Sequence, residues 1–94
     1  MITSAQLRAA RNLIGLSQGQ VAQTTGLSVP TVKRAESEKD VPVSRAAVDA
    51  IRKALENAGV IFIAEDAEGA GVRLRKSRQA EGLRPEELNA ANDD

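Results

Sequence analysis

Residues 17–36 read SQGQVAQTTGLSVPTVKRAE, and apolar residues recur at helical spacing on both sides of Gly26. Ser17 stands three residues before Gln20, the capping-box spacing at which each side chain bonds the backbone N–H of the other residue. A helix is therefore expected over residues 18–25, and Gly26 ends it.

A second helix is expected over residues 28–37. Ser28 can cap it, and Pro30 is tolerated in its first turn because the first N–H groups of a helix have no internal partner. Gly26 permits a tight turn between the two helices, and the small Ala22 suits a close crossing. The stretch predicts a helix-turn-helix whose second helix faces outward.

The neighbouring segments predict two further helices that complete a small core. Residues 4–14, capped by Thr3 or Ser4, form one of them, and it ends at Gly15. After the charged loop 38–44, the other runs from its cap Ser44 to Gly59. The apolar positions expected in this core, on the helices and in the turn between the two helices of the motif, are Leu7, Ala10, Ile14, Val21, Leu27, Val32, Val48, Ile51 and Leu55.

Beyond Gly59 the apolar period changes from 3.6 to 2. The segments VIFIA (60–64) and VRLRK (72–76) flank the turn-rich EDAEGAG and predict a β-hairpin. The last eighteen residues are polar and are expected to be flexible apart from a helical turn in PEEL. The predicted organisation is mainly α, with a domain of four to five helices over 1–58, a hairpin over 59–76 and a tail over 77–94.

The composition excludes several classes of function. The chain has 94 residues, enough for one small domain, and it contains no Cys and no His. Thiol chemistry, imidazole catalysis and the usual zinc ligands are thereby removed, so we expect no enzyme, no catalytic residue, no metal and no cofactor. The longest apolar run, 58–64, is too short to span a bilayer, and we expect a cytoplasmic protein with no membrane partner.

The charges are unevenly distributed although the net charge is zero. Residues 1–35 contain four bases and no acid, whereas residues 36–71 contain eight acids and four bases. Residues 72–78 add four more bases. The bases of the first 35 residues therefore lie where the helix-turn-helix is expected.

The series Ser-Gln, Ala, Gly-x-Ser, Thr-Val and Glu occurs in register at Ser17, Gln18, Ala22, Gly26, Ser28, Thr31, Val32 and Glu36. This pattern resembles the Xre/Cro/λ-repressor-like helix-turn-helix regulators, and the likeness covers about residues 5–56. Two departures occur: Gly19 stands where the family often has Glu, and SEKD at 37–40 replaces the usual Gly. The hairpin is similar to C-terminal additions of short bacterial members.

The resemblance implies a transcriptional regulator, a repressor, that binds double-stranded DNA through residues 28–37. Arg34 would pair with guanine, and Val29 and Pro30 would meet a thymine methyl group. Gln18 would contact a phosphate at the positive end of its helix. The implied DNA-binding residues are Gln18, Ser28, Val29, Pro30, Thr31, Lys33 and Arg34.

Structural interpretations of the same residues stay open. Lys33 and Arg34 could form a solvated face, Gln18 could be only a helix former, and Val29 could pack on residues 41–43. Arg11 and Glu36 look like a family pair, for which we expect a partly buried structural ion pair.

The hairpin predicts a partner surface because both faces of residues 60–64 are apolar. A second subunit would cover the face that the helices leave open, giving a homodimer on a roughly palindromic operator. Two alternatives are that the tail covers this face, or that the hairpin edge captures another protein, as an antitoxin or antiactivator would. The predicted interface residues are Val60, Ile61, Phe62, Ile63 and Leu74.

Overall fold

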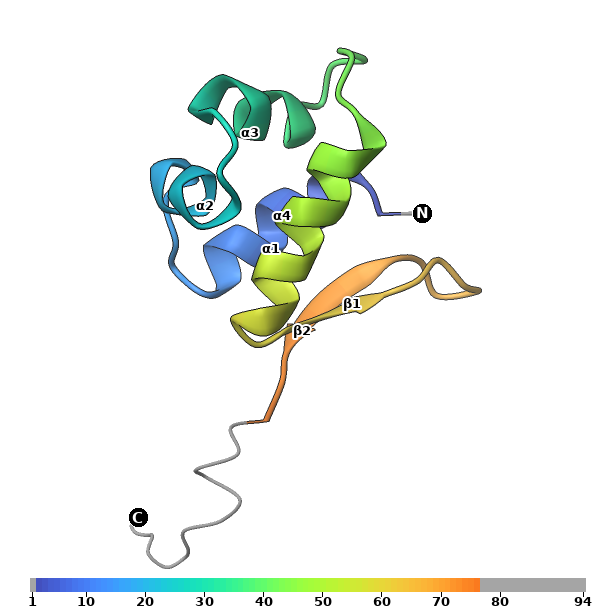
Figure 1. The fold of residues 1–94 in the computed structure, drawn as a ribbon. Coiled ribbons are helices and arrows are strands. Elements are labelled where there is room, and N and C mark those ends of the chain that lie inside the picture. Colours follow the sequence, from blue (N-terminus) through green and yellow to red (C-terminus); the bar gives the residue numbers. More distant parts are fainter. Residues whose placement is uncertain (1, 77–94) are drawn as a thin grey trace, which may run out of the picture.

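The computed structural model describes residues 2–76, which form four helices followed by an antiparallel β-hairpin (Figure 1). The mainly α fold with a C-terminal hairpin is thus confirmed, whereas the predicted tail at 77–94 lies outside the described residues. No helix within residues 2–76 is long and apolar enough to cross a membrane. The elements are α1 (Ser4–Leu13), α2 (Gln18–Thr25), α3 (Val29–Ala35), α4 (Arg45–Asn57), β1 (Val60–Ile63) and β2 (Gly71–Leu74).

The helices begin at side-chain caps that satisfy their first N–H groups. At α1, Gln6 N donates to Thr3 Oγ1 at 3.1 Å, and Thr3 N donates to Gln6 Oε1 at 2.9 Å. Ser17 and Gln20 form the same reciprocal pair at α2, at 3.0 and 2.8 Å, as the sequence predicts. The N-caps of α3 and α4 are Ser28 and Ser44.

Helix α3 ends at Ala35, two residues before the end predicted at residue 37. Glu36 is its C-cap, with ψ at 0°, and the Glu36 carbonyl accepts a hydrogen bond of 2.6 Å from Arg8 Nη1. This bond gives an end carbonyl a partner outside the helix, so the chain can leave α3 at this point.

A single core joins all four helices to the first strand. Val21 of α2 and Val32 of α3 are fully buried in it, and Leu27, in the turn between these helices, packs against it. Ala22 is also buried, as expected where α2 crosses its neighbours closely. The buried apolar residues of this cluster are Leu7, Ala10, Val21, Ala22, Val32, Ala35, Ile51, Leu55 and Val60.

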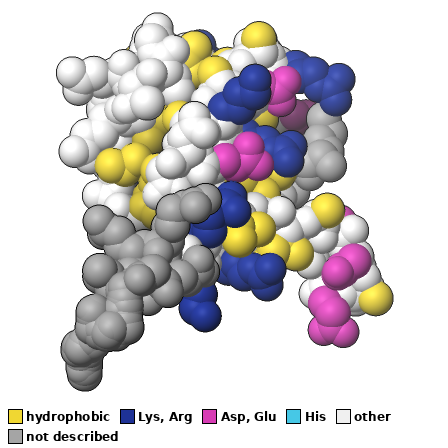
Figure 2. Space-filling view, turned by 60° about the horizontal axis from the view of Figure 1, so that its bottom comes forward, with side chains coloured by type: hydrophobic (Ala, Val, Ile, Leu, Met, Phe, Trp, Pro, Cys, Tyr) yellow, Lys and Arg dark blue, Asp and Glu magenta, His cyan; other side chains and the backbone are white. Residues whose placement is uncertain are grey.

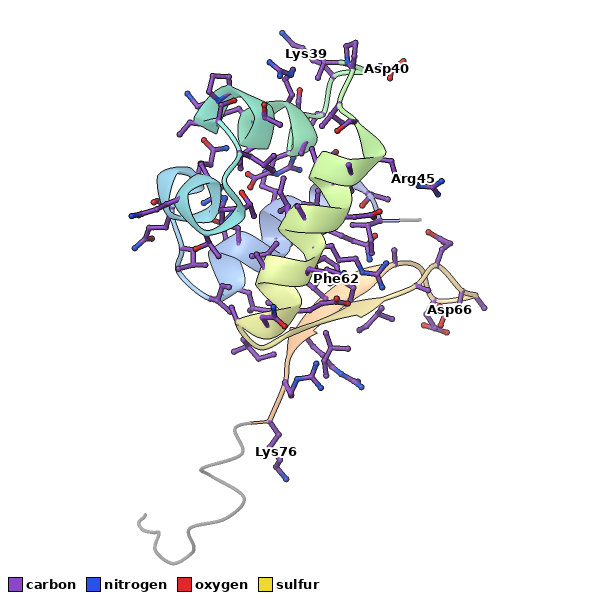
Figure 3. All side chains as sticks on the ribbon, in the orientation of Figure 1. Lys39, Asp40, Arg45, Phe62, Asp66 and Lys76 are labelled. Carbon is purple, nitrogen blue, oxygen red and sulfur yellow. The ribbon has the colours of Figure 1, made fainter. Side chains whose placement is uncertain are left out.

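The hairpin has one face on this core and one face directed away from it. Val60 is fully buried, and Phe62 and its cross-strand partner Val72 pack against the core. Figure 3 shows Phe62 directed toward α4, where the Arg52 guanidinium lies 5.9 Å from the ring centroid. Alternation along the strands places Ile61 and Ile63 on the opposite face, called here the outer face of the hairpin.

Figure 1 places α3 and the hairpin on opposite sides of the helical domain. Helix α3 packs against α2 and α4, whereas the hairpin packs against α1 and α4. The surface around α3 and the outer face of the hairpin are therefore separate surfaces of one small core.

Candidate nucleic-acid interface

Helix α3 presents a continuous exposed face. Val32 and Ala35 are buried on its inner side, so the remaining side chains of this short helix are directed outward. Because the helix is anchored by two buried residues, its exposed face has a fixed orientation relative to α2 and α4. Of the residues that the resemblance assigns to DNA, Thr31 is half-buried, and the exposed ones on or capping this helix are Ser28, Val29, Pro30, Lys33 and Arg34.

Three polar side chains form a chain of hydrogen bonds along this face. Ser28 Oγ accepts a bond of 3.2 Å from Thr31 N and lies 2.8 Å from Thr31 Oγ1. Arg34 Nη2 in turn donates to Thr31 Oγ1 at 3.2 Å. A guanidinium carries five N–H donors, so this single bond positions Arg34 and leaves donors for a further acceptor.

The apolar start of α3 faces solvent. Val29 is 36% exposed, and Pro30 is exposed beside it. In the loop at 41–43, the residue that packs against the core is Val43, and Val29 is outside that cluster. The structure therefore leaves an exposed apolar pair immediately before the basic part of the helix.

Gln18 begins α2 and is half-buried. Its side-chain Nε2 donates a hydrogen bond of 3.2 Å to Glu36 Oε1. An amide nitrogen has two N–H groups, so one remains for a phosphate while the other holds the side chain in place.

Glu36 is the centre of the network that connects α1, α2 and α3. Its carboxylate accepts bonds from Arg11 Nε at 2.7 Å and Arg11 Nη2 at 3.0 Å, in the bidentate geometry that fixes orientation. Arg11 Nη1 also donates to the Leu16 carbonyl at 2.9 Å, in the connection between α1 and α2. Glu36 is only 3% exposed, so the pair is largely removed from water. The network fixes how the two helices of the motif sit on α1.

Arg8 is a member of this network that sequence reasoning missed. Besides its bond to the Glu36 carbonyl, its Nη2 lies 3.5 Å from Glu38 Oε2. Arg8 precedes Arg11 by three residues and so lies on the same face of α1. That spacing is the signal from which a second contact with the end of α3 could have been inferred.

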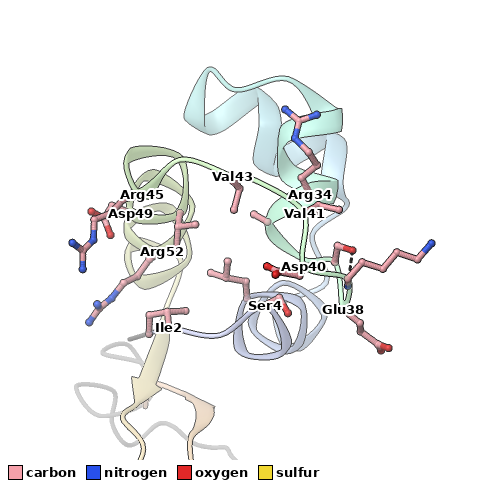
Figure 4. A pocket seen from close by; sticks show the side chains of 15 residues that line it. Ile2, Ser4, Arg34, Glu38, Asp40, Val41, Val43, Arg45, Asp49 and Arg52 are labelled. Carbon is pink, nitrogen blue, oxygen red and sulfur yellow. Dashed lines mark hydrogen bonds between the residues drawn. The ribbon is translucent and has the colours of Figure 1, made fainter.

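A cavity of about 530 Å³ lies beside α3, between the loop after it and the first turns of α1 and α4 (Figure 4). Leu7 and Val48 contribute apolar lining, whereas Arg34, Asp40 and Arg45 are exposed around it. Because both signs of charge occur around its mouth, the cavity does not select an anion or a cation. Its relevance to the interface is that Arg34 forms part of its wall.

The five residues predicted for a dimer interface are divided between the two faces of the hairpin. Val60 is 0% exposed and has no surface to offer a partner, which corrects its assignment to the interface. Phe62 packs against the core on the same face, where Leu74, paired with Val60, is 52% exposed at the open end of the hairpin. Ile61 and Ile63 are half-buried on the outer face. Figure 2 shows hydrophobic side chains on this side of the molecule between groups of basic side chains.

Comparison with known families supports the motif. The family model described as a helix-turn-helix domain matches residues 4–59, which span the four helices and end before the hairpin. The comparison with curated proteins found no match.

Proposed function

This chain belongs to the family of helix-turn-helix domains, and from that premise we propose that it is a sequence-specific DNA-binding regulator of transcription. Helix α3 enters the major groove, and α2 lies across the backbone behind it. The observation that carries the proposal is the exposed face of α3, which offers an apolar pair and then a positioned guanidinium on a rigidly anchored helix.

The side chains of this face suit different parts of a DNA groove. The unused donors of Arg34 can bond O6 and N7 of one guanine, the commonest specific contact in the major groove. Val29 and Pro30 can contact a thymine methyl group, which requires no hydrogen bond. Lys33 is exposed and can neutralise a phosphate.

The remaining assigned residues position the helix on the backbone. Gln18 lies at the positive end of α2, where the first N–H groups and a free amide N–H favour a phosphate. Ser28 and Thr31 hold one another and can share a phosphate contact. The Glu36 network supports this arrangement because it fixes α2 relative to α3 before DNA is bound.

The finer parts of the proposal come from the resemblance to Xre/Cro/λ-repressor-like regulators. We propose that the protein acts in the cytoplasm as a repressor, by occupying a site that transcription requires. A homodimer would double the contact surface, and a roughly palindromic operator follows if the dimer axis brings both α3 helices to one duplex.

A second candidate is a protein-interaction module, an antitoxin or antiactivator that holds another protein through the hairpin. The net charge of zero favours it, because phosphate neutralisation by bases supplies much of the affinity of DNA-binding proteins. The half-buried isoleucines of the outer face supply an apolar surface for such a partner.

DNA titration of variants distinguishes these candidates. Labelled duplex from immediately upstream of the gene, or a duplex selected from a random pool, is titrated at two salt concentrations against excess unrelated DNA. Arg34→Ala should weaken specific binding by about 1–3 kcal/mol, or about 5- to 150-fold. Lys53→Ala, which removes an exposed base from α4, is the matched control and should change binding little.

Salt provides the second part of the test. Wild-type binding should weaken as salt rises, because neutralised phosphates release counterions. Weak binding that is the same for the wild type and Arg34→Ala would contradict reading by α3 and would favour the protein-interaction module.

A further inference from the structure

The outer face of the hairpin carries an apolar centre between two regions of opposite charge. Ile61 and Ile63 form the centre, and the register pairs them with Arg73 and Gly71. Helices α1 and α4 pack against the hairpin, and the residues that face the core are Val60, Phe62 and Val72. Ile61 and Ile63 lie on the other face of the same strands. Two β-branched side chains are thus half-buried on the outer face of a short, well-paired strand.

The turn of the hairpin is acidic and its open end is basic. Residues 65–70 contain three acids and no base, and Figure 3 places Asp66 at the tip of the turn. At the other end, Arg73, Arg75 and Lys76 are all exposed, with no acid among residues 71–76. The hairpin therefore has a negative tip and a positive base along its length.

These two regions lie at matching distances from the Phe62–Val72 pair, which is level with the midpoint between Ile61 and Ile63. Counted from Phe62, Glu65 and Asp66 are three and four positions along the chain. Counted from Val72, the partner of Phe62, Arg75 and Lys76 are also three and four positions along. A two-fold axis that lies over the outer face at the level of this pair, perpendicular to the strands, would therefore bring the tip of one hairpin to the base of a second one.

We propose that the outer face docks a second copy of this chain, with the two hairpins antiparallel and the acidic tip of each against the basic base of the other. The apolar centres meet around the axis and exclude water, and the charges select the antiparallel orientation over the parallel one. This inference deepens the homodimer of the proposed function and rests on it. Because α3 lies on the opposite side of the domain, docking leaves both α3 surfaces uncovered and facing away from each other, so this dimer offers one DNA surface at each end rather than two half-site readers on one duplex.

The size of the face predicts a weak dimer. Standard interfaces bury about 800 Å² on each partner, and two four-residue strands offer less than that. We therefore expect dissociation in the micromolar range, with the charges acting mainly on orientation and association rate.

Three full-length variants test the arrangement by solution mass over a range of protein concentrations. The tip variant carries Glu65→Lys and Glu68→Lys, and the base variant carries Arg73→Glu and Arg75→Glu. Asp66 is left unchanged because its Oδ1 accepts bonds from Glu68 N at 2.8 Å and Gly69 N at 3.1 Å, which shape the turn. All four substituted residues are exposed, so the variants should fold, as circular dichroism can check.

The antiparallel arrangement predicts a specific pattern of loss and rescue. The tip variant and the base variant should each weaken the dimer about tenfold or more, because like charges then meet. An equimolar mixture of the two should form heterodimers, and the third variant, which combines all four substitutions, should recover dimerisation. Raised salt should weaken the wild-type dimer.

The parallel arrangement predicts the reverse for two of these measurements. A wild-type dimer that tightens with salt, or tip and base variants that dimerise as tightly as the wild type, would match the parallel arrangement and overturn the antiparallel proposal. A combined variant that stays weak would show that these charges do not meet across the interface, and it would overturn the proposal as well. Ile63→Asp should abolish dimerisation, and a wild-type protein that is monomeric at every concentration would show that the face is covered within the chain or serves another partner. These measurements contain no DNA, so their failure is separate from any failure of DNA reading by α3.

Discussion

The motif region and the hairpin are attached to the same core by different means. Helix α3 is held through Glu36, whose carboxylate bonds Arg11 from 25 positions away in the sequence. The hairpin is held through Gln6, whose Nε2 donates at 3.0 Å to the carbonyls of Ile63 and Gly71, 57 and 65 positions away. Both connecting groups are almost completely buried, with Gln6 4% exposed and Glu36 3% exposed.

The difference lies in the kind of interaction at each junction. A bidentate ion pair fixes the direction of two helices, which a surface that reads base edges requires. The Gln6 amide is neutral and bonds two backbone carbonyls, which fixes the hairpin without any charge. The first junction is costly to break because a charge is left buried, and the second costs only lost hydrogen bonds.

Breaking the charged junction should have the largest effect. Glu36→Ala leaves Arg11 without its carboxylate and Gln18 without its acceptor, so we expect a loss of about 3 kcal/mol in the free energy of unfolding. Urea denaturation measures it. Glu38→Ala is the control, since its side chain is 84% exposed and should contribute less than about 0.5 kcal/mol. Equal losses for the two variants would show that the network contributes nothing beyond a surface pair.

Breaking the neutral junction should have an intermediate effect that loosens the hairpin as well as the start of α1. Gln6→Ala removes one of the two capping-box bonds of α1 and both bonds to the strands, at a cost of about 2 kcal/mol. Gln20→Ala removes only the matching capping-box bond of α2, because Gln20 is exposed and bonds no strand, so it is the matched control. Amide hydrogen exchange should accelerate in β1 and β2 for Gln6→Ala alone. Exchange that accelerates equally in both variants would contradict the role of Gln6 in holding the hairpin.

Substitution of two glycines in the motif should give the smallest changes in the free energy of unfolding. Gly26→Ala should lower it, whereas Gly19→Ala should raise it. Gly26 has φ at +77° with open space around its Cβ position, so Gly26→Ala should cost about 1 kcal/mol through backbone strain alone. Gly19 lies inside α2, where the nearest atom to an added Cβ is Ser17 Oγ at 3.7 Å, so Gly19→Ala should stabilise by about 0.5 kcal/mol. Thermal unfolding compares them. If both variants change the melting temperature in the same direction, the positive φ of Gly26 would not be what favours glycine at this turn.

The motif region could be read from the sequence because its signals are local. The capping box of Ser17 and Gln20, the stop at Gly26 and the helical apolar spacing each involve residues within one or two turns. The Arg11–Glu36 pair spans more of the chain and was expected only through the resemblance to a known family.

The attachment of the hairpin could not be read in the same way. The change of period predicts two strands, yet the spacing of Thr3 and Gln6 shows no more than a helix cap. Gln6 reaches the strands only because the fold brings α1 beside them, and no pattern within a few residues of Gln6 predicts this long-range contact. Alternation along the strand likewise predicts that Val60 and Ile61 lie on opposite faces. It does not predict which face is buried, and the packing of the hairpin on α1 and α4 shows that it is the face of Val60.

The most direct test of DNA reading by α3 follows α3 and the hairpin in a single experiment. Backbone amide resonances of the full chain are followed by NMR as a selected duplex is added, first with the wild type and then with Arg34→Ala. DNA reading by α3 predicts shifts at Gln18 and at the non-proline residues of 28–34 that diminish in the variant, with the resonances of Arg73, Arg75 and Lys76 unchanged apart from general broadening. Shifts centred on those three residues of the hairpin, with α3 unaffected, would contradict it.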